Sequence, residues 1–236
     1  LDASDGLRDY CNRALDSADT GITRIEAEEV NPESTPFPQA MRDQLAKIVP
    51  EGKSGLLPTH TGDRFALAKK MGEIKMFRLV AYHKNGDREP VRFEFSSESE
   101  GTRRLVDLLP AFHELAWSGK QKVFVIDEVD RSLHTQLTWK LIESYILALR
   151  SDSRSQLIVT THDIMLLDQE LVRRDEVWFV EKFDEGDSRL TALGDFRGIR
   201  KDKDIRKSYL EGRLGGVPRV LMLPSRQKID SGTPDT

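Results

Sequence analysis

Two acidic residues follow a run of apolar residues in the middle of the chain. Residues 122–127 read KVFVID, and Glu128 comes directly after Asp127. A continuous apolar run of this kind is typical of a strand buried on both faces of a sheet. The Asp could hold Mg²⁺, usually through water, and the Glu could polarise a water that attacks a phosphate. A strand that runs into a solvated acidic turn would have the same sequence.

A histidine follows the next apolar run. Residues 156–161 read QLIVTT, and His162 comes after Asp127 by about one strand–helix–strand unit. This spacing predicts that both residues lie at the same edge of neighbouring strands, where ligands of open α/β sheets bind. His162 could then donate a hydrogen bond to a phosphate oxygen. A hydrogen-bonded His that merely ends a strand is the alternative.

A third candidate lies upstream, where residues 99–102 read SEGT. Ser99 can cap a helix that begins here, and the free N–H groups of the first turn can hold phosphate oxygens. An ordinary helix cap explains Ser99 but leaves Gly101 unexplained. Glycine inside a helix is unfavourable unless the backbone must approach another group closely.

The elements that must position these groups alternate along the chain. We predict helices over residues 4–19, 39–49, 100–119 with an interruption or kink at Pro110, 133–149 and 163–174. We predict strands over residues 22–30, 73–83, 89–95, 122–127, 156–161 and 176–183, with a tight turn at Asn85-Gly86 between the second and third. Residues 31–38 and the stretch up to Gly62 read as linker and loop. The alternation favours parallel strand–helix–strand units, hence an α/β fold.

Composition limits the class of protein. The chain has 236 residues with a formal net charge of −4, which argues against a generally basic nucleic-acid coat. A single cysteine, Cys11, excludes an intrachain disulfide framework and predicts a cytoplasmic location. No apolar run approaches the roughly 20 residues of a membrane helix, and no signal peptide is visible. Because the sequence does not begin with Met, we expect its start to be a cut or a processing point.

In this order, the motifs resemble those of the ABC/SMC ATPase superfamily. Residues 99–102 look like a degenerate form of its signature motif, and residues 123–130 look like its Walker B strand. Ser132, Leu133 and His134 occupy the D-loop position, although many relatives have Asp where this chain has His134. His162 matches the switch histidine.

The resemblance is closest to the AbiLi-like ATPases of abortive-infection and restriction loci, and more broadly to RecF- and OLD-like ABC ATPases. It covers residues 75–218 and includes the segment YLEGRLGGVP at residues 209–218. It implies the carboxyl-terminal lobe of an ABC-type P-loop NTPase fold, a mostly parallel sheet flanked by helices, with a helical or irregular amino-terminal segment. The implied domains are residues 1–62, 63–200 and 201–236, the last a basic helical stretch and a disordered tail.

The resemblance also implies a function, an ATPase in a phage-defence or DNA-related system with ATP and Mg²⁺ as cofactors. Asp127 would hold Mg²⁺ through water, and Glu128 and His162 would be catalytic. Ser99, Gly101 and Thr102 would contact the nucleotide held by a second head, so that a homodimer sandwiches ATP. The implied partners are this second head, the amino-terminal half of the same protein, which carries the Walker A loop, and an effector protein.

One apparent phosphate-binding loop is a false match. Gly52-Lys53-Ser54 imitates the end of a Walker A motif, but Lys47 stands where the motif needs its first Gly, and Pro50 intervenes. We therefore expect the Walker A loop elsewhere, and we expect this chain alone to be inactive.

Other functions stay open at this point. The chain could be a non-catalytic ABC-fold module that binds a partner protein. It could belong with nucleases of the overcoming-lysogenization type, although too few residues follow Pro218 for a nuclease domain. DNA or RNA contact is a further option, which a run of basic residues suggests. A solvated helix face would explain the same residues. These are Arg197, Arg200, Lys201, Lys203, Arg206 and Lys207.

Overall fold

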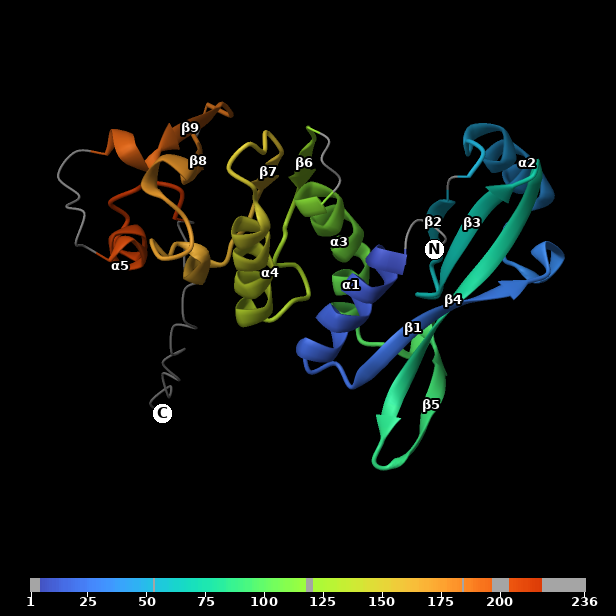
Figure 1. Cartoon of the computed structure of the whole chain (residues 1–236). Helices are drawn as coiled ribbons and strands as arrows, with labels where there is room; N and C mark the ends of the chain where they lie inside the picture. Colours follow the sequence, from blue (N-terminus) through green and yellow to red (C-terminus); the bar gives the residue numbers. More distant parts are fainter. Residues whose placement is uncertain (1–4, 53, 118–120, 184, 197–203, 218–236) are drawn as a thin grey trace, which may run out of the picture. The chain divides into compact units, whose positions relative to one another are not determined.

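The computed structural model describes residues 5–52, 54–117, 121–183, 185–196 and 204–217 (Figure 1). The chain forms two compact units, Leu1–Asp163 and Ile164–Thr236. One sheet of the first unit contains strands that precede residue 62, where the first domain was expected to end, and strands that follow it. No described helix combines the length and apolar character that a membrane span requires.

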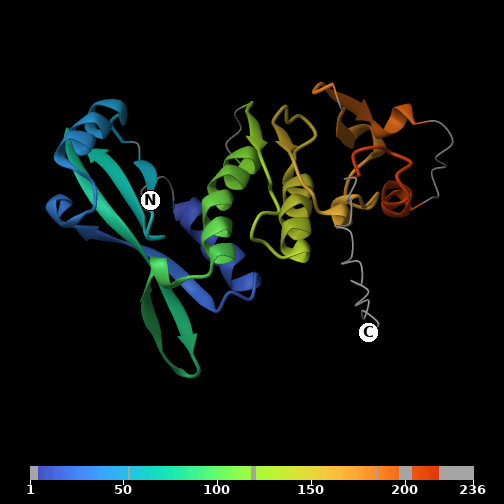
Figure 2. The ribbon, with the colours of Figure 1, turned by 180° about the vertical axis from the view of Figure 1, so that it is seen from behind.

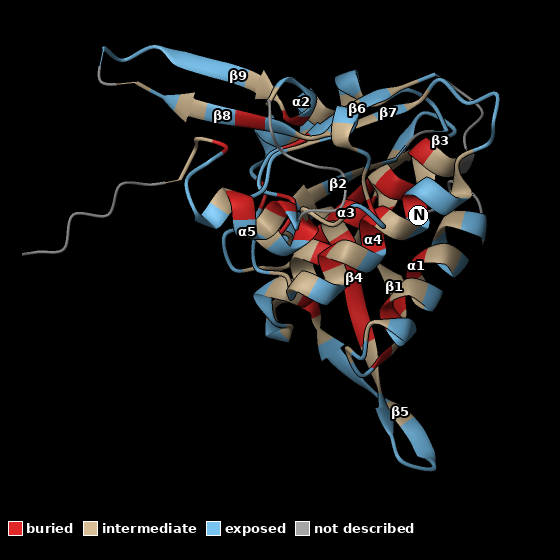
Figure 3. Ribbon diagram, turned by 90° about the vertical axis from the view of Figure 1, so that its left-hand side faces the viewer, coloured by how far each residue is buried: buried red, intermediate tan, exposed pale blue. Residues whose placement is uncertain are grey.

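The first unit contains a five-stranded antiparallel sheet built around one long strand. Its strands are β1 (Ile22–Val30), β2 (Ser54–Pro58), β3 (Arg64–Lys70), β4 (Glu73–Asn85) and β5 (Arg88–Glu94). β1 pairs along one edge of β4, while β3 and β5 pair with the first and second parts of its other edge. Figure 3 shows buried residues on β4 and exposed residues at the tip of the β4–β5 hairpin.

The sequence predicts the β4–β5 hairpin but places its turn one residue early. Asn85 still pairs with Arg88, so the two loop residues are Gly86 and Asp87. Gly86 has φ 57°, as the first central residue of a type II′ turn requires. β2 and β3 are not predicted, because Gly55 and Pro58 make β2 look like a loop.

Helices α1 (Asp5–Ser17) and α2 (Gln39–Ile48) have bounds close to those predicted. α1 packs on β1 and on α3 (Glu100–Trp117). α3 continues through Pro110 without the predicted interruption. Buried Leu15 of α1 and Leu105 of α3 belong to the core that joins these elements.

Two strands carry the predicted chemistry. β6 (Val123–Ile126) and β7 (Gln156–Val159) are parallel neighbours, and Ile126 lies opposite Val159. α4 (Thr135–Ala148) connects them and lies beside α3 in both Figure 1 and Figure 2. The rings of Phe112 on α3 and Tyr145 on α4 meet edge to face at 6.2 Å.

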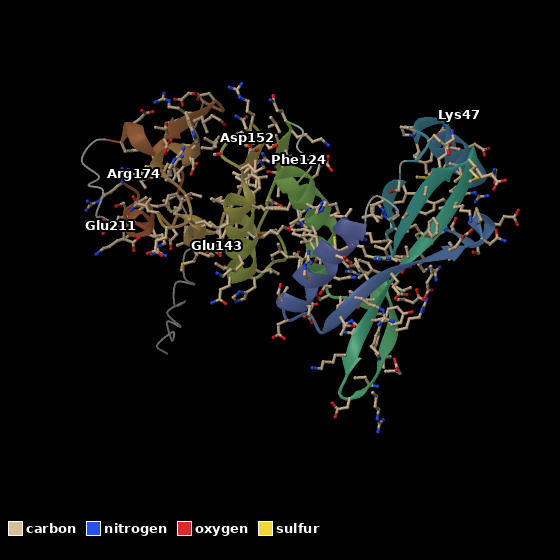
Figure 4. The ribbon with its side chains drawn as sticks, viewed as in Figure 1. Lys47, Phe124, Glu143, Asp152, Arg174 and Glu211 are labelled. Atoms are coloured by element: carbon tan, nitrogen blue, oxygen red, sulfur yellow. The ribbon has the colours of Figure 1, made fainter. Side chains whose placement is uncertain are left out.

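The prediction that these two strands are buried on both faces is wrong for one face. Val123, Val125 and Ile158 are 57%, 69% and 51% exposed, whereas Ile126 is buried and Phe124, labelled in Figure 4, is half-buried. β6 and β7 pair only with each other among the described strands, and the outward face of this pair is solvent-exposed. The α/β class is confirmed, but among the described pairings only this one is parallel.

The second unit is built on an antiparallel pair, β8 (Trp178–Lys182) and β9 (Ser188–Ala192). Among the described pairings, β8 therefore does not join β6 and β7 as the third strand that the alternation suggested. The helix predicted over residues 163–174 is also wrong. The structure has a short 3₁₀ turn at Ile164–Leu166 followed by turns, and a second 3₁₀ turn at Arg174–Glu176.

The core of the second unit consists of Phe179, Leu193, Ile205 and Leu214. Leu214 belongs to the YLEGRLGGVP segment, which follows α5 (Ile205–Leu210). The Tyr209 hydroxyl donates to the Gly216 carbonyl at 3.0 Å. This segment therefore closes the core of its own unit. The predicted disordered tail, PSRQKIDSGTPDT at residues 224–236, lies outside the described residues.

Candidate active site

Thr160 joins the ends of β6 and β7. Its hydroxyl donates to Oδ1 of Asp127 and accepts from the N–H of Glu128 at 2.8 Å. Its carbonyl accepts from the N–H of Val129 at 3.0 Å, and its own N–H donates to the Ile126 carbonyl at 3.1 Å. The acidic turn after β6 and the polar turn after β7 are therefore neighbours at one edge.

His162 reaches the same acidic turn. Its Nε2 lies 3.2 Å from Oδ2 of Asp130. The Asp130 side chain is only 5% exposed, and its Oδ1 has no hydrogen-bond partner among the described residues. A buried carboxylate of this kind is costly unless it is paired. We infer that the Asp130 carboxylate orients the imidazole of His162. The edge that carries Asp127, Glu128 and His162 is called the rim below.

Glu128 stands at a strained position of this rim. It has φ 48°, an uncommon conformation for a residue with a side chain, and such strain costs on the order of 1–3 kcal/mol. Its carboxylate is exposed and has no partner within the described part of the chain. Arg104, from α3, stabilises the turn, because its Nη2 lies 3.2 Å from the carbonyls of both Asp127 and Glu128. The turn therefore keeps the Glu128 carboxylate exposed, while the backbone on either side of it is held by hydrogen bonds.

Ser99 caps α3, as predicted. Its hydroxyl accepts from the N–H of Thr102 at 3.0 Å and also contacts the Thr102 hydroxyl at 2.9 Å. Thr102 is buried, so its side chain is directed at the cap. A Cβ on Gly101 would lie 2.6 Å from the Ser132 carbonyl. The close approach that a glycine in this first turn suggests is therefore to the backbone of Ser132.

Residues 132–134, for which the resemblance implies a D-loop, lie in a tight turn between β6 and α4. Ser132 has φ 61°, and the N–H of Leu133 donates to the Asp130 carbonyl at 3.0 Å. His134 caps α4, since its Nδ1 accepts from the N–H of Gln136 at 3.2 Å. The structure therefore gives His134 a capping contact where many ABC relatives have Asp.

Residues 12–168 match the model of the family described as "AAA domain, putative AbiEii toxin, Type IV TA system". The chain belongs to this AAA-domain family. A search of curated proteins gave no match.

The match spans most of the first unit and includes every predicted site residue of this AAA domain. Membership indicates a nucleotide-binding domain of the ATPase type.

The rim of the AAA domain can supply part of the ligand set that Mg²⁺ needs. Asp127 is exposed, and its Oδ2 has no partner among the described residues. The described residues contain no group of three or more His, Cys, Asp or Glu side chains arranged as a metal site. Mg²⁺ typically keeps several waters and takes one or two carboxylates with substrate phosphates. Asp127 suits that role when a nucleotide supplies the other oxygens.

The Gly52-Lys53-Ser54 stretch of the AAA domain does not have the geometry of a phosphate-binding loop. Such a loop joins a strand to a helix. Ser54 instead begins β2, which pairs antiparallel with β3. Lys53 lies outside the described residues.

Three residues near this rim were not predicted from the sequence as site residues. Thr160 and Asp130 could have been found, because each is a polar residue that follows an apolar run and shares its turn with a predicted site residue. Arg104 could not, because its contact with the acidic turn joins segments that are remote in sequence. Of the basic residues proposed for nucleic acid, four lie outside the described residues, and Arg206 pairs with Asp204 and Asp168.

Proposed function

We propose that this AAA domain supplies the Walker B, D-loop and histidine turns of an ATPase head that hydrolyses ATP with Mg²⁺. The observation that carries the proposal is the shared rim, where Thr160 joins the strand ends and His162 reaches Asp130. Since the sequence contains no complete Walker A motif, we propose that a separate segment supplies the phosphate-binding loop.

In this proposal the chain's own side chains position Mg²⁺ and the phosphate oxygens and polarise the attacking water. Asp127 would hold Mg²⁺ through water, and the bound metal would neutralise charge on the phosphate oxygens. The free carboxylate of Glu128 would orient the attacking water, and His162 would donate to a phosphate oxygen. Phosphoryl transfer depends mainly on such positioning and electrostatic stabilisation.

The proposal includes a dimer of two heads. The start of α3 would face the nucleotide of the second head through Ser99 and the backbone at Gly101. Thr102 contributes through the cap, because its hydroxyl contacts Ser99. The resemblance to AbiLi-like ATPases supports a role in phage defence with an effector protein, and leaves contact with DNA or RNA as a further proposal.

The decisive experiment is Glu128→Gln in the complex of this chain with the segment that carries the Walker A loop. We expect ATP binding to persist and turnover to fall at least a hundredfold, because the amide cannot act as a general base. Phosphate release and nucleotide binding would be measured in parallel. Glu33→Gln is a matched control, since Glu33 is exposed in the turn after β1.

The opposite outcome has a clear meaning. If Glu128→Gln and the wild type turn over ATP equally, or if neither does, the catalytic proposal is wrong. The chain would then be better described as a non-catalytic module that binds a partner protein.

A further inference from the structure

One end of the antiparallel sheet carries exposed apolar side chains on two neighbouring segments. The first segment is α2 with the loop that follows it, and the second is the tight turn between β3 and β4 (Figure 1). Ile48 at the end of α2 is 73% exposed, Met71 in the turn is 88% exposed, and Met41 of α2 is 40% exposed. We call residues 39–52 and 69–75 the tip.

The turn of the tip has an unusual sequence. Met71 and Gly72 are its two central residues, with φ 53° and 79°, and the flanking residues Lys70 and Glu73 pair with each other. A turn with positive φ at both central residues favours Asn-Gly. A methionine at the first of these positions is strained, and Met71 gains no burial in return. The chain therefore keeps a large apolar side chain at the point of the hairpin at a cost in stability, which indicates a role in binding.

Hydrogen bonds join α2 and its following loop to this turn. The Lys69 ammonium donates to the Ala46 carbonyl at 3.2 Å, and the Gly52 N–H donates to the Lys69 carbonyl at 2.9 Å. The Gly72 N–H donates to Oε2 of Glu51 at 3.2 Å. The end of the helix and the turn therefore form one surface.

The apolar face of α2 is not covered within the described fold. Met41, Leu45 and Ile48 recur at helical spacing, yet none of the residues of α2 is buried. Polar contacts hold the helix in place, such as the one from Nη1 of Arg42 to the Phe37 carbonyl at 2.6 Å. An amphipathic helix of this kind has an apolar face that can lie on another surface.

The tip is basic in a chain whose net charge is −4. Residues 39–53 and 69–75 contain six basic and three acidic residues. Lys75 is neutralised by Glu29 of β1, because its Nζ lies 3.0 Å from Oε1 of that carboxylate, so five basic residues remain against three acidic ones. Lys47, labelled in Figure 4, is exposed next to Ile48. This excess of positive charge complements an anionic surface.

We propose that the tip binds the surface of an anionic lipid bilayer, with Ile48 and Met71 inserted among the headgroups. Apolar side chains at the point of a hairpin and at the end of a helix can enter a soft surface, whereas a protein partner would need a matching cavity. Lysine stems can follow the apolar side chains while the ammonium groups reach lipid phosphates. The proposal does not depend on ATP hydrolysis, because the tip contains none of the rim residues.

The test is co-sedimentation of the 236-residue chain with vesicles of equal parts phosphatidylglycerol and phosphatidylcholine at low salt. We expect the wild type to bind reversibly, and Met71→Asn should lower the partition coefficient about fivefold or more, because its apolar side chain no longer enters the bilayer. The same substitution should raise the urea midpoint of unfolding, because Asn-Gly suits this turn. Weaker lipid binding by a more stable variant cannot result from misfolding.

Two more variants test the helix and the charge. Ile48→Gln should lower the partition coefficient by about the same factor. Lys47→Gln should lower it about fivefold for the anionic vesicles by removing one positive charge near the surface. Leu147→Gln is the matched control, since Leu147 of α4 is 77% exposed but lies outside the tip, and its binding should equal that of the wild type.

Vesicles of phosphatidylcholine alone measure the part played by charge. We expect weaker binding to them, and added salt should weaken binding to the anionic vesicles. Equal binding to both kinds of vesicle would overturn the assignment of an anionic surface. Equal binding by the wild type and Met71→Asn would overturn the whole proposal. No binding of the wild type to anionic vesicles would do the same, and would make a partner protein the better candidate for this tip.

Discussion

Gly101 allows the first turn of α3 to touch the turn that contains Ser132. Because a Cβ here would lie 2.6 Å from the Ser132 carbonyl, Gly101→Ala must displace one of the two turns. We expect a loss of about 1–3 kcal/mol in the free energy of unfolding, the usual cost of overpacking. Urea denaturation followed by circular dichroism measures this loss.

Gly55→Ala is the control for that substitution. A Cβ at Gly55, in β2, would meet no atom within 4 Å. An alanine there should stabilise the fold by about 0.5 kcal/mol or leave it unchanged, because it reduces the freedom of the unfolded chain. Equal stability of the two variants would contradict the close approach of the two motifs.

Cys11 makes the stability of the first unit depend on alkaline pH. The thiol is 3% exposed, and burial raises its pKa from 9.0 to about 12. Above pH 9 the unfolded chain loses this proton while the folded chain keeps it. The free energy of unfolding should therefore fall by about 1.4 kcal/mol per pH unit between pH 9 and pH 12.

The measurement is the free energy of unfolding in urea at pH 8, 9, 10 and 11. Tyr10, whose pKa is raised to about 12 by burial and by the neighbouring Cys11, adds to the loss only above pH 10, so the comparison is made below that pH. Cys11→Ala should lower the slope between pH 9 and pH 10. If the variant and the wild type lose stability equally over this interval, the thiol is not protected by folding.

At the scale of elements, the helices of the first unit and the two strands of the rim were predictable, whereas several pairings and the structure of residues 163–174 were not. Helical periodicity predicts α1, α3 and α4 because each has one apolar face. β2 was missed because Gly55 and Pro58 are typical of loops, although β3 pairs with it. β3 also pairs with β4. Local propensity does not indicate which strands become neighbours, so the strand order could not be predicted.

The β6–β7 pair shows the opposite kind of error. Continuous apolar residues predicted burial on both faces, but the outward face holds exposed Val123, Val125 and Ile158. Apolar surface of this kind binds hydrophobic dyes. We expect Val125→Lys and Ile158→Lys each to lower the fluorescence of bound anilinonaphthalene sulfonate while leaving the far-ultraviolet circular dichroism unchanged.

The control for this prediction is a single apolar residue elsewhere in the first unit. Ile48, at the end of α2, is 73% exposed. Ile48→Lys removes a similar side chain without affecting β6 or β7, so the fluorescence should change little. A fall as large as that of Val125→Lys would show that the dye does not report this face.

At the scale of the whole molecule, the sequence located the candidate site better than it located the boundaries. The acids, the histidine and the serine-glycine turn were recognised from local patterns and lie on neighbouring turns of the first unit. The division after Asp163 was not predicted, because the run DIMLLDQELVRR suggested a helix that would continue the first unit. The structure instead begins the second unit with a 3₁₀ turn there.

The whole chain has Asp127 and Glu128 at the rim but no complete Walker A motif in its 236 residues. The Walker A lysine and backbone donors hold the β- and γ-phosphates, so ATP would lack positioning at this rim without them. We expect the purified chain to show no Mg²⁺-dependent ATP turnover, and addition of the segment that carries this loop should restore it. Turnover by the chain alone that disappears in Glu128→Gln would show instead that these residues hold the triphosphate without that loop.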